Sequence, residues 1–348
     1  MSRATMWWIS GAMILAGAAS LLAMGSWAAG TEPLTTIKSV PLPALHDGDF
    51  DHFAVDLQGK RLFSAAEENS KVLVFNLESG ALLHTIDGLK APHSMAYRSD
   101  LKKLFVVDGD LGVVRMYDGK TYKDLGDVKL RLGADSSTYD PATKYMYVVD
   151  GGRDAHLPNC YVSVVDTTKA KEVAEVPLDS SDVEAVVLEK KGPRMFVVIR
   201  GNNTIEVFNR RKTKPVLLAT WPLLKDATRP TAMAFDEAAH RLFIGTRNPG
   251  MLIVLDSNSG KVVASLPAAS MVDNMAWDAA HKRIYFAGTE FLDVFQQRDA
   301  DHYELAGHIP TGFRAKTGIY VPQLDRYYLG IPHHENATAE LRIFSVVR

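Results

Sequence analysis

The sequence predicts an all-β protein: a seven-bladed β-propeller with four antiparallel strands in each blade and a ring closed by an N-terminal strand that completes the last blade. Three observations predict it. One pattern recurs along the chain, as in "DHFAVDLQGKRLFSAA" at 51–66, "TAMAFDEAAHRLFIGT" at 231–246 and "DNMAWDAAHKRIYFAG" at 273–288. Its period is close to 42 residues, which is the size of one propeller blade. After the N-terminus, no segment of useful length has the apolar periodicity of a helix.

The repeat can be counted from a marker residue that lies six places before a pair of large apolar residues such as Leu-Phe or Ile-Tyr. The markers are separated by 42, 42, 49, 47, 42 and 43 residues, and they are Asp56, Arg98, Asp140, Glu189, Asp236, Asp278 and Val321. Within each unit, apolar and polar residues alternate in short runs that Gly, Asn and Asp interrupt. This pattern is typical of β-strands joined by tight turns.

The first unit shows the elements in order, with strands at "HFAVD", "RLFSAA", "VLVFNL" and "LLHTID". The seventh unit supplies only three strands before the chain ends at Arg348. Residues 34–42 read like the fourth strands of other units, and Pro41 stands where those units carry Pro177, Pro222, Pro267 and Pro310. We therefore expect residues 34–42 to complete the seventh blade, because closure removes the exposed edges of a sheet.

The N-terminus predicts export from the cytoplasm. Arg3 is the only charged residue before Glu32, an apolar run extends from Met6 to Met24, and "SWA" at 26–28 has the small-x-small form that a signal peptidase cleaves. We expect a signal peptide at residues 1–28 and a single propeller domain at residues 29–348. The alternative is an uncleaved anchor, since the apolar run is close to the ~18 residues that span a bilayer. Both outcomes predict a periplasmic or secreted domain.

The composition excludes several other classes of protein. Hydrophobic residues make up 47% of the chain and charged residues 23%, as in ordinary globular proteins. The formal charge is −2 and Lys and Arg do not cluster, which argues against a nucleic-acid partner. A single cysteine, Cys160, excludes an internal disulfide, and we expect its side chain to be buried.

Differences in loop length indicate which face of the ring binds other molecules. Insertions occur between strands two and three of unit 3 ("GGRDAHLPN") and unit 7 ("PHHENATA"), and before strand one of unit 5 ("LKDATRP"). In a ring of four-stranded blades these loops all lie on one face. The other face carries only tight turns. Repeat proteins usually bind their ligands on the face that holds the insertions.

The first residue of strand one in each unit is expected at the mouth of the central channel, on the face with the insertions. Six of these seven residues are ionisable: Asp51, His93, Asp135, Glu184, Thr231, Asp273 and Lys316. Crowded, desolvated carboxylates are costly unless a cation, a substrate or a salt bridge offsets them. We therefore predict a ligand-binding site formed by this ring, to which Arg229 and His333 also contribute.

Further ionisable groups are expected to surround the mouth on the same face. They are His46, Asp49, Glu67, Glu68, Asp108, Asp150, Arg153, Asp154, His156, Arg200, Arg247, Glu290, His334 and Glu335.

The residues leave two functions open. One is a propeller that binds a small polar ligand or a periplasmic protein, which the absence of a G-x-S-x-G elbow, a P-loop and a G-x-G-x-x-G turn supports. The other is a metal-assisted hydrolase, lactonase or lyase that acts on a small carbohydrate-like or acyl substrate. For this enzyme the catalytic candidates are His93, Asp135, Glu184 and Lys316.

The same ring could hold a divalent metal ion, namely Ca²⁺, Zn²⁺ or Cu²⁺. The candidate ligands are imidazoles and carboxylates, which such ions bind: His93, Asp51, Asp135, His333 and His334. The alternative is a wide, water-filled channel in which ionisable side chains are merely tolerated and Lys316 and Arg229 neutralise part of the acidic charge.

The strand-two segments "KLFVVDG" (103–109), "YMYVVDGG" (145–152) and "RMFVVIRGN" (194–202), together with the ending "VLDSNSGKVVASL" (254–266), resemble the YVTN-type, YncE-like bacterial β-propellers. The resemblance covers nearly the whole chain after the N-terminal segment. The tetrapeptide that names the family does not occur, and "YVVD" at 147–150 is the nearest form. The resemblance implies an exported seven-bladed propeller, but it implies no particular reaction, because one fold serves many functions.

Overall fold

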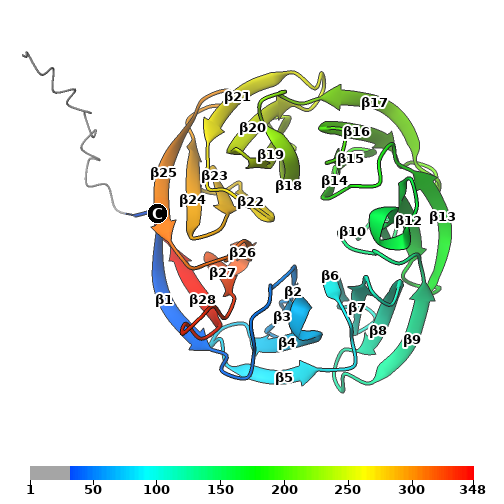
Figure 1. Cartoon of the computed structure of the whole chain (residues 1–348), viewed down its shortest axis with the longest axis vertical. Coiled ribbons are helices and arrows are strands. Elements are labelled where there is room, and N and C mark those ends of the chain that lie inside the picture. The colour runs from blue at the N-terminus through cyan, green and yellow to red at the C-terminus, as the bar shows by residue number, and fades with distance from the viewer. Residues whose placement is uncertain (1–31) are drawn as a thin grey trace, which may run out of the picture. The chain divides into compact units, whose positions relative to one another are not determined.

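The computed structural model describes residues 32–348, so the predicted signal peptide lies outside the described residues. Residues 32–348 form seven four-stranded antiparallel sheets around a central opening (Figure 1). The predicted fold class is therefore confirmed. In the part of the chain that the structure describes, no helix has both the length and the hydropathy needed to cross a membrane.

The blades follow one another along the chain. Blade 1 contains β2 (Phe53–Asp56), β3 (Arg61–Ala66), β4 (Lys71–Asn76) and β5 (Leu82–Ile86). Blade 2 contains β6 (Pro92–Arg98), β7 (Lys103–Asp108), β8 (Val113–Asp118) and β9 (Asp124–Lys129). Blade 3 contains β10 (Ser137–Asp140), β11 (Tyr145–Gly151), β12 (Cys160–Asp166) and β13 (Lys171–Pro177). Blade 4 contains β14 (Val186–Leu188), β15 (Arg194–Ile199), β16 (Thr204–Asn209) and β17 (Val216–Pro222).

The second half of the ring repeats this arrangement. Blade 5 contains β18 (Thr228–Asp236), β19 (Arg241–Asn248), β20 (Gly250–Asp256) and β21 (Val262–Pro267). Blade 6 contains β22 (Asn274–Asp278), β23 (Arg283–Ala287), β24 (Phe291–Gln297) and β25 (Tyr303–Pro310). Blade 7 contains β26 (Thr317–Val321), β27 (Arg326–Ile331), β28 (Glu340–Val346) and β1 (Leu34–Pro41).

The ring closes as the sequence predicts. β1 pairs antiparallel with β28, with Leu34 opposite Val346 and Pro41 opposite Glu340. Pro41 ends the outermost strand of its blade, and so do the four prolines that it matches. An outermost strand tolerates proline because one of its edges has no neighbouring strand that would need the missing N–H.

The paired apolar residues of the repeat form the core. Successive side chains of a strand point to opposite faces of its sheet. Leu62 therefore packs between blades 7 and 1, while its neighbour Phe63 packs between blades 1 and 2. The other pairs divide in the same way, so that the buried apolar residues among 32–348 form seven clusters, one at each junction between blades. This division explains why the chain repeats the motif.

The marker residues at the end of strand one organise the opposite face, which we call the turn face. Asp140 Oδ1 accepts the backbone N–H of Ala142 at 2.9 Å, and Asp140 also pairs with the Arg210 guanidinium. At the start of strand two, Arg241 Nε donates to the carbonyl of Ala300 in the next blade at 2.9 Å. Charged side chains of the turn face are thus used to join strands and blades.

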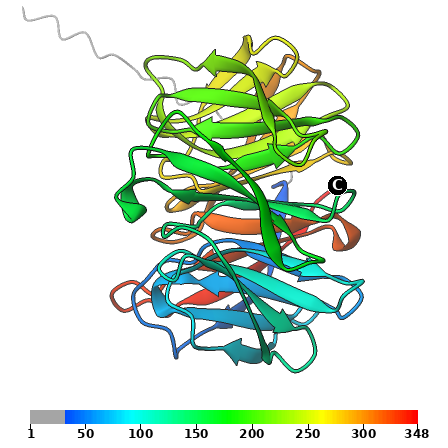
Figure 2. The same cartoon turned by 90° about the vertical axis from the view of Figure 1, so that its right-hand side faces the viewer.

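The inserted loops lie on the other face, which we call the loop face. Figure 1 views this face, and Figure 2 shows the loop around the short helix η2 (Gly152–Ala155) projecting from it at the left. A second short helix, η1 (Glu67–Asn69), occupies the corresponding connection of blade 1.

Candidate functional site

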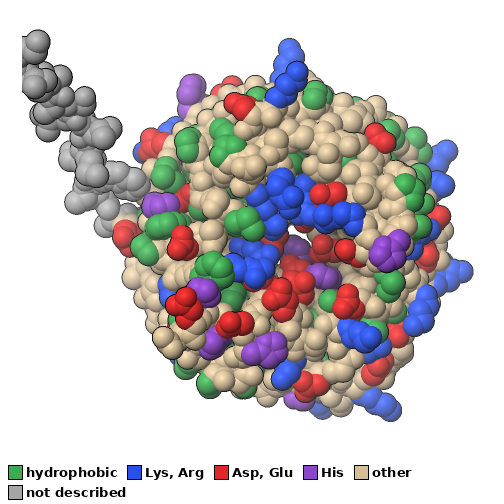
Figure 3. Space-filling view, viewed as in Figure 1, with side chains coloured by type: hydrophobic (Ala, Val, Ile, Leu, Met, Phe, Trp, Pro, Cys, Tyr) green, Lys and Arg blue, Asp and Glu red, His purple; other side chains and the backbone are tan. Residues whose placement is uncertain are grey.

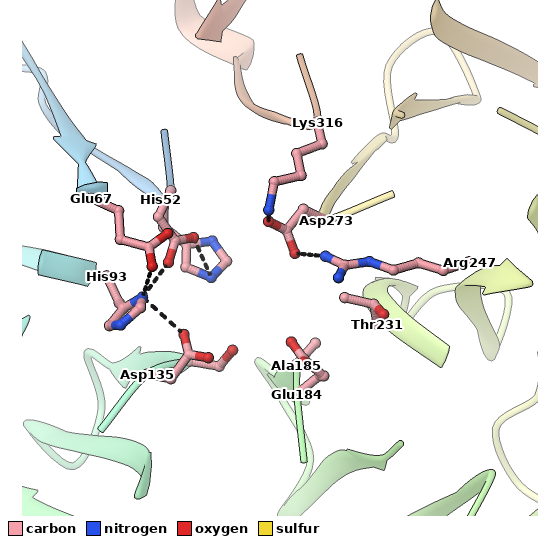
Figure 4. A pocket seen from close by; sticks show the side chains of 12 residues that line it. His52, Glu67, His93, Asp135, Glu184, Ala185, Thr231, Arg247, Asp273 and Lys316 are labelled. Atoms are coloured by element: carbon pink, nitrogen blue, oxygen red, sulfur yellow. Dashed lines mark hydrogen bonds and ion pairs between the residues drawn. The ribbon is translucent and has the colours of Figure 1, made fainter. Parts of the chain in front are cut away.

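A small cavity lies at the mouth of the central channel on the loop face (Figure 4), with a volume of about 160 Å³. Its lining includes all seven residues that the sequence places at the mouth. The lining residues are Asp51, His52, Glu67, His93, Asp135, Ser136, Glu184, Ala185, Thr231, Arg247, Asp273 and Lys316. The seven blades therefore each contribute a side chain to one enclosed polar space.

The expectation that the mouth residues begin strand one was slightly wrong. Five of them precede their strands by one or two residues, while His93 and Thr231 lie within β6 and β18. The strand-two neighbour still holds the backbone, because the N–H of Asp135 donates to the carbonyl of Val149 at 2.9 Å. Asp51, Glu184 and Asp273 make the equivalent bonds. One repeated backbone contact thus directs these four side chains into the channel.

Blades 1 to 3 place three carboxylates around one imidazole nitrogen. His93 Nδ1 lies 2.7 Å from Asp51 Oδ2, 3.5 Å from Asp135 Oδ1 and 3.9 Å from Glu67 Oε1. Figure 4 shows the side chains of Glu67 and Asp135 directed toward His93. We call Asp51, Glu67, His93 and Asp135 the acidic cluster.

His52 contacts the acidic cluster through Asp51. Its Nε2 lies 3.4 Å from Asp51 Oδ1, and its Nδ1 lies 2.8 Å from Asn274 Nδ2. The Asn274 amide is oriented by its oxygen, which accepts the backbone N–H of Gly318 at 3.2 Å. Because the amide nitrogen then donates to Nδ1, the His52 proton belongs on Nε2, where it faces Asp51.

The opposite wall of the cavity carries the permanent cations. Lys316 Nζ lies 2.9 Å from Asp273 Oδ2 and 2.9 Å from Asp49 Oδ2, and an Arg247 nitrogen lies 2.6 Å from Asp273 Oδ1. Figure 3 shows a similar division around the central opening, with Lys and Arg side chains mainly above it and to its left and acidic side chains mainly below it. Neither cation forms an ion pair with a carboxylate of the acidic cluster.

Glu184 lies on the wall that blade 4 forms. It pairs with the Arg200 guanidinium, which also donates to Asp182 through Nε at 2.7 Å. Burial raises the pKa of Glu184 to about 8, Arg200 opposes the shift, and Asp135 adds to it. The shift means that burial and neighbouring negative charge outweigh both Arg200 and Arg247.

The acidic cluster shows the same excess of negative charge. Burial raises the pKa of Glu67 to about 8, and the neighbouring Asp51 carboxylate adds to this shift. Burial also raises the pKa of Asp135. Burial alone would lower the pKa of His93, but Asp135 and Asp51 outweigh it and hold the pKa well above 6.5. At neutral pH the acidic cluster therefore carries less negative charge than its three carboxyl groups would carry in water.

Asp51 and Lys316 behave as paired ions. Burial alone would raise the pKa of Asp51, but His52 and the His93 Nδ1–H group outweigh it, so the pKa lies well below its usual value. Burial alone would lower the pKa of Lys316, but Asp273 and Asp49 raise it above its usual value. Lys316 is therefore an ammonium ion at neutral pH, which excludes it as an amine nucleophile.

Several residues expected at the mouth lie elsewhere. Arg229 is exposed and does not line the cavity. His333 and His334 line a neighbouring cavity of about 140 Å³, where His333 pairs with Asp47 and His334 stacks on Phe313. The five candidate metal ligands are thus divided between two places, because the blade 7 insertion folds against the segment before β2.

The expectation that Asp108 and Asp150 surround the mouth was wrong. Both side chains are fully buried and accept bonds from the backbone: Asp108 from Lys90 N at 2.7 Å, and Asp150 from Arg131 N at 3.0 Å. They hold the loops between blades. Cys160 is buried as predicted, and burial raises the pKa of its thiol to about 12, which argues against thiolate chemistry.

His52 is the site residue that the sequence analysis missed. It occupies the position after the mouth residue, where the other blades carry small or short polar residues. Those residues are Ser94, Ser136, Ala185, Ala232, Asn274 and Thr317. The alignment of the seven units therefore already showed one unusually large side chain, the His52 imidazole, at this position.

The lining holds five carboxylates and two permanent cations, and both cations already contact Asp273. Such a cavity favours a ligand that carries positive charge or several hydrogen-bond donors. At about 160 Å³ the cavity is too small for a polymer chain to pass through. Its chemistry is that of a site for a small polar ligand or an ion.

Comparison with known proteins extends only to the fold. No protein-family model matches the chain, and no curated protein matches it. A chain in the solved structure described as "Crystal Structure of Mitotic Checkpoint Complex" is similar over 100% of this chain and 99% of that one, with a TM-score of 0.74 and 14% identity. The WD40 repeats of RRP9 are similar over 88% of this chain and 99% of theirs, with a TM-score of 0.71 and 14% identity. At these identities the similarity shows a seven-bladed propeller, and the YVTN-type, YncE-like relationship stays a prediction.

Proposed function

We propose that this protein is an exported propeller, periplasmic or secreted, that binds a small polar ligand in the cavity at the channel mouth. One observation carries the proposal: each of the seven blades directs a side chain into a single enclosed polar space that holds more carboxylates than cations. The cores between the blades stabilise the ring without this arrangement. Raised carboxylate pKa values are an energetic cost, and such costs are typical of functional sites.

A thermal-shift screen of small polar compounds against the full protein tests this proposal. We expect a ligand that raises the melting temperature of the wild type and whose affinity falls at least about 10-fold in Asp135→Asn and in Glu184→Gln, since each loses a charged hydrogen-bond partner. Asp273 is a poorer choice, because it holds Arg247 and Lys316 together. Glu237→Gln, on the turn face, is the control. Equal affinity in the wild type and both cavity variants would place binding elsewhere.

The second candidate is a metal-assisted hydrolase, lactonase or lyase that acts on a small carbohydrate-like or acyl substrate at the same cavity. The observation that favours it is Glu184, because a carboxyl group with a pKa of about 8 is a proton donor at neutral pH. Lys316 would stabilise developing negative charge. Glu184→Gln separates the two functions: in an enzyme it abolishes turnover with substrate affinity largely kept, whereas in a binding protein wild type and variant both leave the ligand unchanged.

A partner protein is the other ligand that this face could take. One similar solved structure is described as a complex, and the inserted loops of blades 3 and 7 lie on the same face as the cavity. A partner would contact those loops rather than enter the cavity. Binding that is lost in Arg153→Glu but kept in Glu184→Gln would therefore favour a protein partner over a small ligand.

A further inference from the structure

We propose that Asp51, Glu67 and His93 bind one divalent transition-metal ion at the mouth of the channel. This inference rests on the cavity of the proposed function, but not on the identity of its organic ligand. One donor atom from each residue lies within 4.8 Å of the other two. Metal–ligand distances near 2.1 Å place neighbouring donors of a tetrahedral ion about 3.4 Å apart. The observed separations from His93 Nδ1, 2.7 Å to Asp51 and 3.9 Å to Glu67, lie on either side of that value.

The three donors come from separate elements that the fold holds in place. Asp51 is fixed by its backbone bond to β3, Glu67 lies in η1, and His93 comes from β6 of the next blade. The ring of His93 packs closely against Gly109, because a Cβ added there would lie 2.9 Å from His93 Nε2. The backbone of the β7–β8 loop thus keeps Nδ1 directed at the carboxylates.

The other possible donor set, Asp51, His52 and Asp135, fits a metal less well. The contact with Asn274 places the His52 proton on Nε2, the nitrogen nearest Asp51. His52 therefore has no lone pair left for a metal, because its Nδ1 already accepts the Asn274 bond. By contrast, a metal in the acidic cluster would replace the proton that His93 Nδ1 donates to Asp51. His52 instead acts as a positioning residue for the Asp51 carboxylate, as groups behind metal ligands commonly do.

The charge of the cavity also calls for a cation here. Lys316 and Arg247 are bound to carboxylates on the far wall, and no Lys or Arg among residues 32–348 forms an ion pair with Asp51, Glu67 or Asp135. Asp135 makes only the 3.5 Å contact with His93 and no hydrogen bond within residues 32–348 through its carboxylate. It can therefore accept a bond from a metal-bound water. The imidazole favours Zn²⁺ or a similar ion over Ca²⁺, which prefers oxygen ligands alone.

The test is a titration of the full chain, prepared without a histidine tag and stripped with a chelator, with ZnCl₂ by calorimetry. We expect one equivalent of Zn²⁺ in the wild type and a loss of affinity of at least about 100-fold in His93→Ala and in Glu67→Gln. His302→Ala is the matched control. His302 forms the same kind of pair, 2.8 Å from Asp299, but it is exposed and has no third donor.

The variants must remain folded for the comparison to count. Glu67→Gln keeps the size of the side chain, and an unchanged circular dichroism spectrum establishes that its ring is intact. Equal Zn²⁺ affinity in wild type, Glu67→Gln and His93→Ala would overturn the inference, and so would the absence of any Zn²⁺ binding beyond that of non-specific surface sites. Tighter binding of Ca²⁺ than of Zn²⁺ would overturn the assignment to a transition metal.

The two proposals fail separately. If Zn²⁺ does not bind but a small polar ligand still depends on Asp135 and Glu184, the proposed function stands and the metal site is wrong. If Zn²⁺ binds as expected but no ligand of the screen depends on Glu184, the metal site stands and the proposed function is wrong.

Discussion

Asp135 and Asp140 stand at the two ends of the first strand of blade 3, five residues apart, and their surroundings differ completely. Asp140 is buried on the turn face, where it accepts a backbone N–H, bonds to Thr143 Oγ1 at 2.9 Å and pairs with Arg210. Asp135 faces the cavity of the loop face, and among residues 32–348 its carboxylate forms an ion pair with His93 alone, at 3.5 Å. An aspartate thus joins strands at the turn-face end of this strand, whereas the aspartate at the loop-face end is available to bind a ligand.

Two glutamates repeat the comparison. Glu237, on the turn face, accepts three backbone N–H groups of the β14–β15 turn. Burial alone would raise its pKa, but these bonds outweigh burial and lower it. Burial has the opposite net result for Glu184 at the mouth, whose pKa rises to about 8. Carboxylates on the turn face are therefore paired with backbone N–H groups or arginines that join the strands. Carboxylates at the mouth outnumber their partners, and this is where we expect a ligand.

The largest effect is expected from breaking a contact of the turn face. In Arg61→Ala the buried Asp56 loses a partner at 2.5 Å, and the bond to the next blade at the Gly119 carbonyl is also lost. Leaving one member of a buried ion pair alone costs about 3–5 kcal/mol. Urea unfolding measures the loss, and Arg211→Ala, which changes an exposed side chain of the same face, should stay within about 0.5 kcal/mol of wild type. Equal effects in both variants would show that these contacts do not join the blades.

An effect of comparable size, and of opposite sign at the two ends, is expected from pH. Because the pKa of Glu184 is raised to about 8, the folded protein holds its proton while the unfolded chain loses it above pH 4.5. The free energy of unfolding should therefore fall as pH rises from 4.5 to 8, by up to about 1.4 kcal/mol per pH unit for this one group. Glu237 contributes stability that is present above pH 4.5 and is lost as pH falls through its lowered pKa.

Unfolding curves between pH 3 and pH 9 check both signs at once. Glu184→Gln should flatten the fall above pH 4.5, and Glu237→Gln should flatten the loss below it. A Glu184→Gln variant whose slope matches wild type would mean that this carboxyl group titrates normally.

The sequence predicted the ring and its closure because strands repeat with a simple period. The paired apolar residues and the prolines at strand ends identify seven equivalent units, and equivalence then places Asp51, His93 and Lys316 around one axis. Backbone equivalence does not specify side-chain partners, however. Asp108 and Asp150 were assigned to the mouth, yet their carboxylates turn back to bind backbone N–H groups.

Loops outside the repeat were harder to predict for a related reason. His333 belongs to the inserted loop of blade 7, whose sequence differs from that of the blade 3 insertion, and its pairing with Asp47 depends on a contact between residues 286 positions apart in the chain. Arg229 lies two residues before the mouth residue of its blade, but its φ is positive, the strand pairing shifts register between Pro230 and Ala232, and its side chain is exposed. His52 was not predicted because the repeat was identified from its apolar residues, and the other blades carry a small or short polar residue at this position.

The most direct test of this account compares the free energies of unfolding of Asp140→Asn and Asp135→Asn at one pH near neutrality. We expect Asp140→Asn to lose about 3 kcal/mol, since Arg210 is left without its carboxylate, and Asp135→Asn to remain within about 1 kcal/mol of wild type or to be more stable. Losses of similar size in both variants would contradict the account. Asp135 would then stabilise the fold as Asp140 does, and its carboxylate would not be available to bind a ligand.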